Sequence, residues 1–150
     1  MHYIFIALLL AFADPAPPED LIDKEIIIRN IKSPKGIFII SVYNDAAGFP
    51  KVGKEEQINK VMVNDTLPHS IKIHVSSEGW YAIAMFQDED VTGKIKQDKI
   101  GVPEEAYGFS NNIHPRVEAP GFAACKFYIS KQDTKPLEIN LIQPRFHGKL

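Results

Sequence analysis

Short apolar runs rich in β-branched and aromatic residues recur along most of this chain, and turn residues separate them. Runs of this length are typical of β-strands, whereas an amphipathic helix needs apolar residues every three or four positions over a longer stretch. The sequence has no convincing helix of that kind. Seven runs are predicted as strands: residues 24–31, 36–44, 59–64, 70–76, 79–87, 121–130 and 136–143.

Seven short strands over about 120 residues predict an all-β fold, a seven-stranded antiparallel β-sandwich of immunoglobulin-like or transthyretin-like kind. Residues 79–87 are apolar on both faces, which predicts a central strand. The "SPKG" stretch, residues 33–36, predicts a type I turn that joins the first two strands in a hairpin. Tyr81 follows a glycine at a strand start, which predicts a tyrosine corner whose hydroxyl bonds to the backbone.

The N-terminus differs from the rest of the chain. An unbroken apolar run of 11 residues extends from Tyr3 to Ala13, which is too short for the roughly 20 residues that span a bilayer. It ends in a small-x-small pattern typical of signal-peptide cleavage, and the prolines that follow disfavour the alternative of a buried strand. We therefore predict a signal peptide at 1–13, a flexible proline-rich tail at 14–22 and a single β-sandwich domain at 23–150.

This organisation predicts an exported protein, periplasmic or secreted, with no membrane span after signal removal. The net charge is −2 and there is no long basic block, so we expect no nucleic-acid partner. One cysteine excludes an internal disulfide. Cys125 lies in an apolar run, which predicts a small buried core residue.

Residues 81–112, "YAIAMFQDEDVTGKIKQDKIGVPEEAYGFSNN", resemble the signature of the domain-of-unknown-function family 2141. The family pattern is roughly YA(V/I)xxxHDxNxNGxxDxxxxGxPxExYGFSNN. The resemblance extends to "IIIRNIKSPKGIFIISVYN" and to "PGFAACKFYI", and "GVPEEAYGFSNN" is its most specific part. It implies a small exported bacterial β-sandwich, and it implies no mechanism.

In that family the acidic loop resembles a calcium loop, with acids or amides at alternate positions, then a glycine and another acid. Asp88, Asp90 and Thr92 hold the first, third and fifth positions, and Gly93 keeps the turn. Lys96, however, replaces the last acid. A compensating ligand would come from elsewhere, from Glu89, Asp98, Glu104 or Glu105. The alternatives are a weak calcium site and a solvated turn whose Asp side chains bond nearby backbone N–H groups.

The "GVPEEAYGFSNN" segment also has two interpretations. In the structural one, Tyr107 and Phe109 plug into the sandwich, the polar residues bond to backbone groups in the turn, and Glu105 accepts bonds from backbone amides. In the functional one, loops at one end of the sandwich form a recognition surface for a glycan or peptide. The candidate ligand-binding residues are then Tyr107, Ser110, Asn111, Asn112 and Glu105.

Catalytic motifs are absent from the sequence. A triad of Ser110, His114 and Glu105 can be drawn, but no GxSxG motif surrounds the serine. We therefore expect a non-catalytic binding or structural accessory module of the cell envelope, without a cofactor unless calcium binds. The alternatives are a calcium-dependent adhesion or stabilisation module, a small hydrolase, and a transthyretin-like carrier with a concave apolar pocket.

Overall fold

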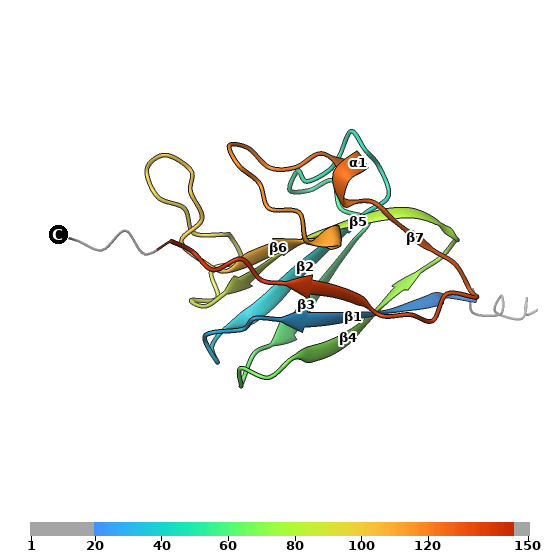
Figure 1. The fold of residues 1–150 in the computed structure, drawn as a ribbon, viewed down its shortest axis with the longest axis horizontal. Helices are drawn as coiled ribbons and strands as arrows, with labels where there is room; N and C mark the ends of the chain where they lie inside the picture. Colours follow the sequence, from blue (N-terminus) through green and yellow to red (C-terminus); the bar gives the residue numbers. More distant parts are fainter. Residues whose placement is uncertain (1–19, 146–150) are drawn as a thin grey trace, which may run out of the picture.

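The computed structural model describes residues 20–145, and nearly all of the regular structure there is β (Figure 1). The helical segments are two single turns, η1 (Ser110–Asn112) and α1 (Phe122–Cys125). The strands are β1 (Ile22–Arg29), β2 (Ile37–Tyr43), β3 (Gln57–Met62), β4 (His69–Val75), β5 (Gly79–Asp88), β6 (Tyr107–Phe109), β7 (Phe127–Ile129) and β8 (Leu137–Asn140). No helix within residues 20–145 has the length and hydrophobicity to cross a membrane.

The strands form two sheets. The smaller sheet has the order β4-β1-β8, and the larger has the order β3-β2-β5-β6, with β7 also paired to β5. Strand β5 pairs with β2 along one edge and with both β6 and β7 along the other. The prediction that residues 79–87 form a central strand is therefore confirmed.

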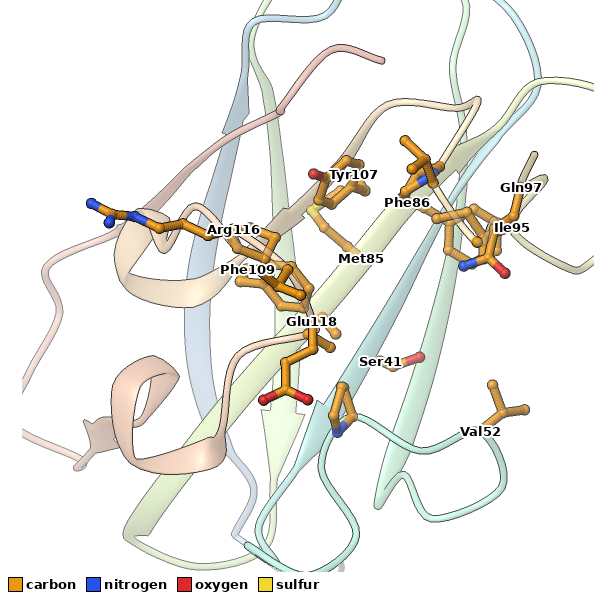
Figure 2. A pocket seen from close by; sticks show the side chains of 18 of the residues that line it. Ser41, Val52, Met85, Phe86, Ile95, Gln97, Tyr107, Phe109, Arg116 and Glu118 are labelled. Atoms are coloured by element: carbon orange, nitrogen blue, oxygen red, sulfur yellow. The ribbon is translucent and has the colours of Figure 1, made fainter. Parts of the chain in front are cut away.

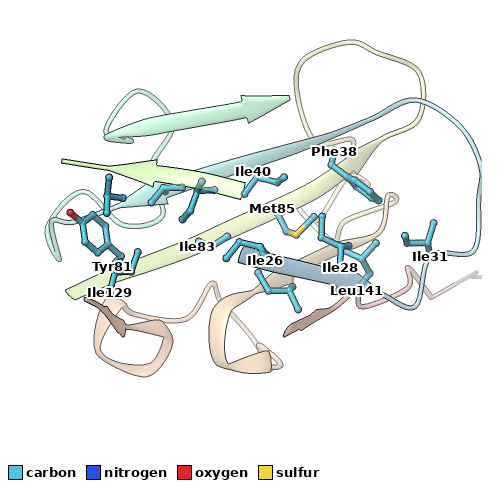
Figure 3. Close-up of a cluster of buried hydrophobic side chains, with 14 of the residues drawn as sticks. Ile26, Ile28, Ile31, Phe38, Ile40, Tyr81, Ile83, Met85, Ile129 and Leu141 are labelled. Atoms are coloured by element: carbon cyan, nitrogen blue, oxygen red, sulfur yellow. The ribbon is translucent and has the colours of Figure 1, made fainter. Parts of the chain in front are cut away.

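The main hydrophobic core lies between the two sheets (Figure 3). Alternation with a period of two sends one set of side chains from each strand into it. Ile26 and Ile28 enter from β1, and Ile83 and Met85 enter from β5, all nearly inaccessible to solvent. Tyr81 closes one end of this core, and its Oη donates a hydrogen bond to the Ser77 carbonyl at 2.8 Å. The predicted tyrosine corner is confirmed.

The predicted hairpin between the first two strands is wrong. Strand β1 pairs with β4 and β8, whereas β2 belongs to the other sheet, so residues 30–36 carry the chain from one sheet to the other. Gly36 has φ +76°, and a Cβ there would lie 2.0 Å from the Asp88 carbonyl oxygen. The lack of a side chain at Gly36 therefore lets the backbone approach β5 closely. The turn residues signalled a change of direction, but they did not specify the pairing partner.

The sandwich is not wholly antiparallel, because β1 and β8 pair in parallel. Strand orientation depends on which sheet edge is free when the chain returns, and local sequence does not encode that. The described chain has eight strands instead of seven. The extra strand, β6, lies inside the predicted long loop and has only three residues, too few for a recognisable alternation.

Two predicted boundaries also change. Residues 121–130 were predicted as one strand, but they form the turn α1 followed by β7, and Lys126 N donates to Phe122 O at 2.8 Å. The predicted tail ends earlier than residue 22, because Ile22 is already buried in β1. The predicted signal peptide, 1–13, lies outside the described residues.

Candidate functional site

A second apolar layer covers the outer face of the larger sheet. Its buried residues are Tyr43, Phe49, Ala82 and Cys125, with Ala84, Phe109, Ile113 and Phe122 packed against them. Phe49 lies at the centre and makes edge contacts with three other rings, at centroid distances of 5.1 to 6.3 Å. Both faces of β2 and β5 are thus covered by apolar groups, which explains why their sequences lack alternation.

An open pocket of about 440 Å³ adjoins this layer (Figure 2). Ser41 of β2 and Ala84 of β5 are cross-strand partners, and their small side chains line it. The aromatic rings of Phe86, Tyr107 and Phe109 line the same pocket, and Phe109 is the cross-strand partner of Ala84. The small side chains at these two positions leave room for the cavity.

Three loops complete the walls of the pocket, and all three project from the same side of the larger sheet (Figure 1). They are residues 44–56, 89–106 and 113–121. Their apolar contributions are Pro50, Val52, Ile95, Ile100, Val102, Pro103, Pro115, Val117 and Ala119. Polar groups come from Glu55, Gln97, Arg116 and Glu118. The pocket is therefore mainly apolar with a few polar groups, the usual composition of an organic-ligand site.

Tyr43 supplies a phenol to the lining. Its Oη lies 3.4 Å from both the Lys51 carbonyl oxygen and Glu55 Oε1. Burial, together with the nearby Glu55 carboxylate, raises the pKa of Tyr43 to about 12. The phenol thus stays protonated at neutral pH and acts as a hydrogen-bond donor.

Two buried carboxylates hold the loop 89–106 against the sheet. Asp88 accepts hydrogen bonds from the backbone N–H groups of Thr92 at 3.0 Å and Gly93 at 2.7 Å. Glu105 accepts from the N–H groups of Glu89 at 3.0 Å and of residue 96 at 2.9 Å. The expectation that Glu105 accepts backbone amides is confirmed. Asp88 bonds to N–H groups as the turn alternative expected, although its side chain is buried and not solvated.

The same loop brings three carboxylates together. Oxygen atoms of Asp88, Asp90 and Glu105 lie within 4.8 Å of one another, and Asp88 and Glu105 are buried while Asp90 is exposed. The lysine that departs from the calcium-loop pattern turns elsewhere: Lys96 Nζ is exposed and lies 3.8 Å from Glu104 Oε2. Thr92 Oγ1 donates to the Lys94 carbonyl at 3.0 Å.

A protein-family model described as an uncharacterized protein conserved in bacteria (DUF2141) matches residues 26–136. The chain belongs to this family. The resemblance seen in the sequence is thus confirmed, and the matched span contains the pocket, the carboxylate cluster and the "GVPEEAYGFSNN" segment. The comparisons found no matching curated protein and no matching solved structure.

In this DUF2141 chain, Tyr107 and Phe109 do not plug into the sandwich as predicted. They lie on the outer face of β6, where Tyr107 pairs across from Phe86 and Phe109 from Ala84. Gly108, between them, faces the core. The alternation of the strand decides this: only one side of β6 can face inward, and glycine takes it. Of the predicted ligand residues, Tyr107 alone lines the pocket.

The next three predicted ligand residues are bonded to the protein's own backbone. Ser110 is fully buried; its Oγ accepts from Ile83 N at 2.9 Å and donates to the Cys125 carbonyl. Asn111 Nδ2 donates to the carbonyls of Ala124 at 3.1 Å and Lys126 at 2.9 Å. These bonds fasten the turn η1 to the segment around α1.

Asn112 performs the same function toward β8. Its Nδ2 donates to the Glu138 carbonyl at 3.2 Å, and its Oδ1 accepts from Asn140 N at 2.7 Å. Both asparagines have positive φ, 61° for Asn111 and 53° for Asn112, a conformation that asparagine tolerates better than most residues. The structural interpretation of this segment is therefore confirmed for its bonding to backbone groups.

The residues of the hypothetical triad are engaged separately. The Ser110 hydroxyl and the Glu105 carboxylate are each bonded to backbone groups, and His114 is exposed. No hydrogen bond within residues 20–145 joins any two of the three.

Sequence reasoning also missed most of the pocket. The available signal was the lack of alternation in β2 and β5, which indicates a second apolar layer.

Proposed function

We propose that this chain is an exported, non-catalytic binding module of the bacterial cell envelope, and that its outer-face pocket holds an organic ligand. This proposal rests on the pocket. Its volume of about 440 Å³ lies within the range of roughly 300–1,000 Å³ that is usual for small-molecule sites. Loops anchored on a packed sheet surround it, which is the common arrangement of binding sites on β folds.

The lining favours an amphipathic ligand. Its apolar part would lie over Ser41 and Ala84, beside the three aromatic rings that line the pocket. Its polar part would remain at the mouth, near Gln97, Arg116 and Glu118. This arrangement satisfies the condition set for a carrier, a concave apolar pocket. Two packed sheets and the tyrosine corner support the immunoglobulin-like or transthyretin-like sandwich as part of the same proposal.

Export is supported by the apolar run at residues 3–13 and its small-x-small ending. Mass spectrometry of the protein recovered from its native cells tests export: cleavage after Ala13 is the expected result.

A non-catalytic role is supported by the separate engagement of Ser110 and Glu105 described above. Absence of hydrolase activity, or activity that a Ser110→Ala variant retains, would exclude the triad, whereas an activity lost specifically in that variant would revive the hydrolase alternative.

Titration with a fluorescent apolar probe, N-phenyl-1-naphthylamine, tests the pocket. Ser41→Leu fills the base of the cavity with a larger apolar side chain. Ser76→Leu makes the same chemical change at an exposed bend outside the pocket, and serves as the control. We expect one probe per chain and at least tenfold weaker binding in Ser41→Leu only. Equal binding by both variants would contradict the proposal.

The carboxylate cluster supports a second candidate, a calcium-dependent stabilisation or adhesion module. Asp88 and Glu105 are buried close together with Asp90. Like charges at such distances repel one another in a medium of lower dielectric constant than water, and a divalent cation would remove that cost. Oxygen ligands of this kind suit calcium. Lys96 Nζ is exposed and lies beside Glu104, and Glu105 supplies a carboxylate to the cluster in place of the missing acid.

A thermal melt with calcium and then with a chelator tests this second candidate. Within the described chain no hydrogen bond involves the Asp90 carboxylate, so Asp90→Asn removes one ligand charge without breaking a structural bond. Glu104→Gln, in the same loop but outside the cluster, is the control. Binding at a hundred times the dissociation constant should stabilise the fold by about 2.7 kcal/mol. A calcium shift that Asp90→Asn leaves unchanged would overturn this assignment.

A further inference from the structure

The surroundings of the pocket carry a net negative charge. The three loops that form its walls, residues 44–56, 89–106 and 113–121, contain more aspartates and glutamates than lysines and arginines. A hollow with apolar walls concentrates the field of the charges around it. A ligand that enters this pocket therefore passes a region that favours cations over anions.

Three charged side chains line the pocket itself, and two of them are acidic. They are Glu55, Arg116 and Glu118. Arg116 and Glu118 are exposed, whereas Glu55 is half-buried. In Figure 2 the guanidinium of Arg116 lies away from the other labelled side chains. Because salt and water screen exposed charges more strongly than buried ones, Glu55 is the charge that acts most on a bound ligand.

Glu55 is held in position but is not neutralised. Its Oε2 accepts a hydrogen bond from Gly53 N at 2.7 Å. Its Oε1 lies 3.4 Å from Tyr43 Oη, which is longer than the roughly 2.5–3.0 Å of a good O–H···O bond. Among residues 20–145, no lysine, arginine or histidine forms an ion pair with it. Oε1 therefore keeps the capacity to accept a strong hydrogen bond from a ligand.

Aromatic rings line the same pocket. They belong to Phe86, Tyr107 and Phe109, and the rings of Tyr107 and Phe109 meet edge to face at a centroid distance of 6.1 Å. The face of an aromatic ring carries a partial negative charge and attracts ammonium groups that approach it closely. Aromatic rings together with a carboxylate that lacks a cation are the chemistry that recognises an alkylammonium group.

The charge of Glu55 also weighs against the other classes of ligand. An anionic group would be repelled by the carboxylate. A neutral ligand that covered Glu55 would remove its water without replacing the lost hydrogen bonds, which is unfavourable. An ammonium group would replace that water with an ion pair and a charge-assisted hydrogen bond.

We propose that the pocket selects an amphipathic ligand whose polar group is an ammonium, and that Glu55 is the partner of this group. The position of the ligand's polar part is thereby refined, from the exposed side chains at the mouth to a half-buried carboxylate. The inference deepens the proposed function, on which it rests, by naming the charge and chemical class of the polar group.

Competition against bound N-phenyl-1-naphthylamine tests this assignment in the full chain. The competitors share a decyl tail and differ in charge: decylammonium, decyl sulfate and decyl maltoside. They are used below their critical micelle concentrations, with a chelator present so that the carboxylate cluster holds no metal, and circular dichroism verifies the fold. We expect decylammonium to displace the probe at a concentration about tenfold lower than either of the others, as for one hydrogen bond between charged groups.

Matched variants assign the preference to one residue. Glu55→Gln removes the charge and keeps an oxygen that can accept from Gly53 N, whereas Glu56→Gln makes the same change at an exposed neighbour that does not line the pocket. The advantage of decylammonium over decyl maltoside should fall at least fivefold in Glu55→Gln and persist in Glu56→Gln. Glu118→Gln should reduce it less, because that carboxylate is exposed. Equal advantages in the first two variants would overturn the proposal, and so would a preference for decyl sulfate that Arg116→Gln abolishes.

The proposed function and this assignment fail separately. Probe binding that the three competitors displace equally would overturn the ammonium assignment and leave the pocket as an apolar ligand site. If the probe does not bind, calorimetric titration with decylammonium decides the outcome. Heat that depends on Glu55 would overturn the apolar pocket and leave a site for the ammonium group alone, whereas no heat would overturn both.

Discussion

Gly108 of β6 lies directly against Ile139 of β8, so that a Cβ at position 108 would come within 2.8 Å of Ile139 Cγ2. The two strands belong to different sheets, and this contact sets how closely the sheets approach at that point. Beside it, Tyr107 and Ile142 exchange two backbone hydrogen bonds, of 3.1 and 2.6 Å. The close approach at Gly108 therefore helps to fix the direction of Tyr107 and Phe109, which face the pocket.

Gly108→Ala should lower the free energy of unfolding by about 1–3 kcal/mol, the usual cost of inserting a methyl group into a packed core. Gly121→Ala is the matched control, because a Cβ there meets nothing within 4 Å and φ is −78°. Urea denaturation measures both. A double variant with Ile139→Ala should lose less than the sum of the two single changes; strict additivity would show that the two positions do not clash.

Tyr81→Phe should lower the free energy of unfolding by about 1 kcal/mol, because it removes the hydrogen bond to the Ser77 carbonyl and leaves the ring in place. Tyr128→Phe makes the same change on a side chain that is 46% exposed, and should be close to neutral. Thermal and chemical denaturation of the two variants measure this difference in stability. Equal effects at the two positions would mean that the corner bond does not stabilise the fold.

Much of the fold could be predicted from the sequence because its signals are local. The alternation in β4, the apolar run of β5 and the placement of Tyr81 each depend on a few neighbouring residues. Pairing could not be predicted in the same way. Whether β1 joins β2 or crosses to another sheet depends on contacts far apart in the chain, and so does the parallel pairing of β8.

The site was predicted in part, for a similar reason. Glu105 was correctly expected to accept backbone amides, and the bonds of Asp88 to N–H groups of its turn were one of the two alternatives that the sequence left open. The predicted direction of the Tyr107 side chain was wrong, because it depends on which side of β6 packs against Ile139. The lack of alternation in β2 and β5 indicates an outer apolar layer, but the position of the pocket depends on the register between Ser41 and Ala84, which no local pattern reveals.

Asn112→Ala should destabilise the fold by about 1–3 kcal/mol, since it removes two hydrogen bonds to β8 and places alanine at a positive φ. Asn112→Gly keeps the backbone freedom and loses only the bonds, so it should cost less. Binding of the apolar probe by the folded variants should be unchanged, because Asn112 does not line that pocket. A selective loss of ligand binding at full stability would restore Asn112 as a recognition residue.

Asp133→Asn should destabilise the fold at neutral pH and have progressively less effect in acid. Lys24 is 5% exposed and its Nζ contacts Asp133 Oδ2 at 2.9 Å; this hydrogen bond, together with the backbone N–H of Lys135, lowers the pKa of Asp133. A lowered folded-state pKa contributes stability that is complete above the unfolded value and disappears as pH falls through the folded value.

Urea denaturation at several pH values, from about 7 down to about 2, measures this effect. The wild-type and Asp133→Asn curves should converge at the acid end. Lys24→Met keeps the packed stem without the buried ammonium, and it should reduce the effect of Asp133→Asn, because no unpaired cation is left behind. A difference between wild type and Asp133→Asn that does not change with pH would assign the effect to packing instead of charge.

Cys125 should be unreactive in the folded protein. It is fully buried, and burial raises the pKa of its thiol to about 11, so the thiolate fraction at pH 8 is roughly one in a thousand. Ellman's reagent should therefore label the native chain very slowly and the urea-unfolded chain completely. A Ser76→Cys variant supplies an exposed thiol for comparison, and it should show one fast and one slow reaction. Fast labelling of the unmodified native chain would mean that the outer apolar layer opens readily, and the pocket beside it would then lack a fixed wall.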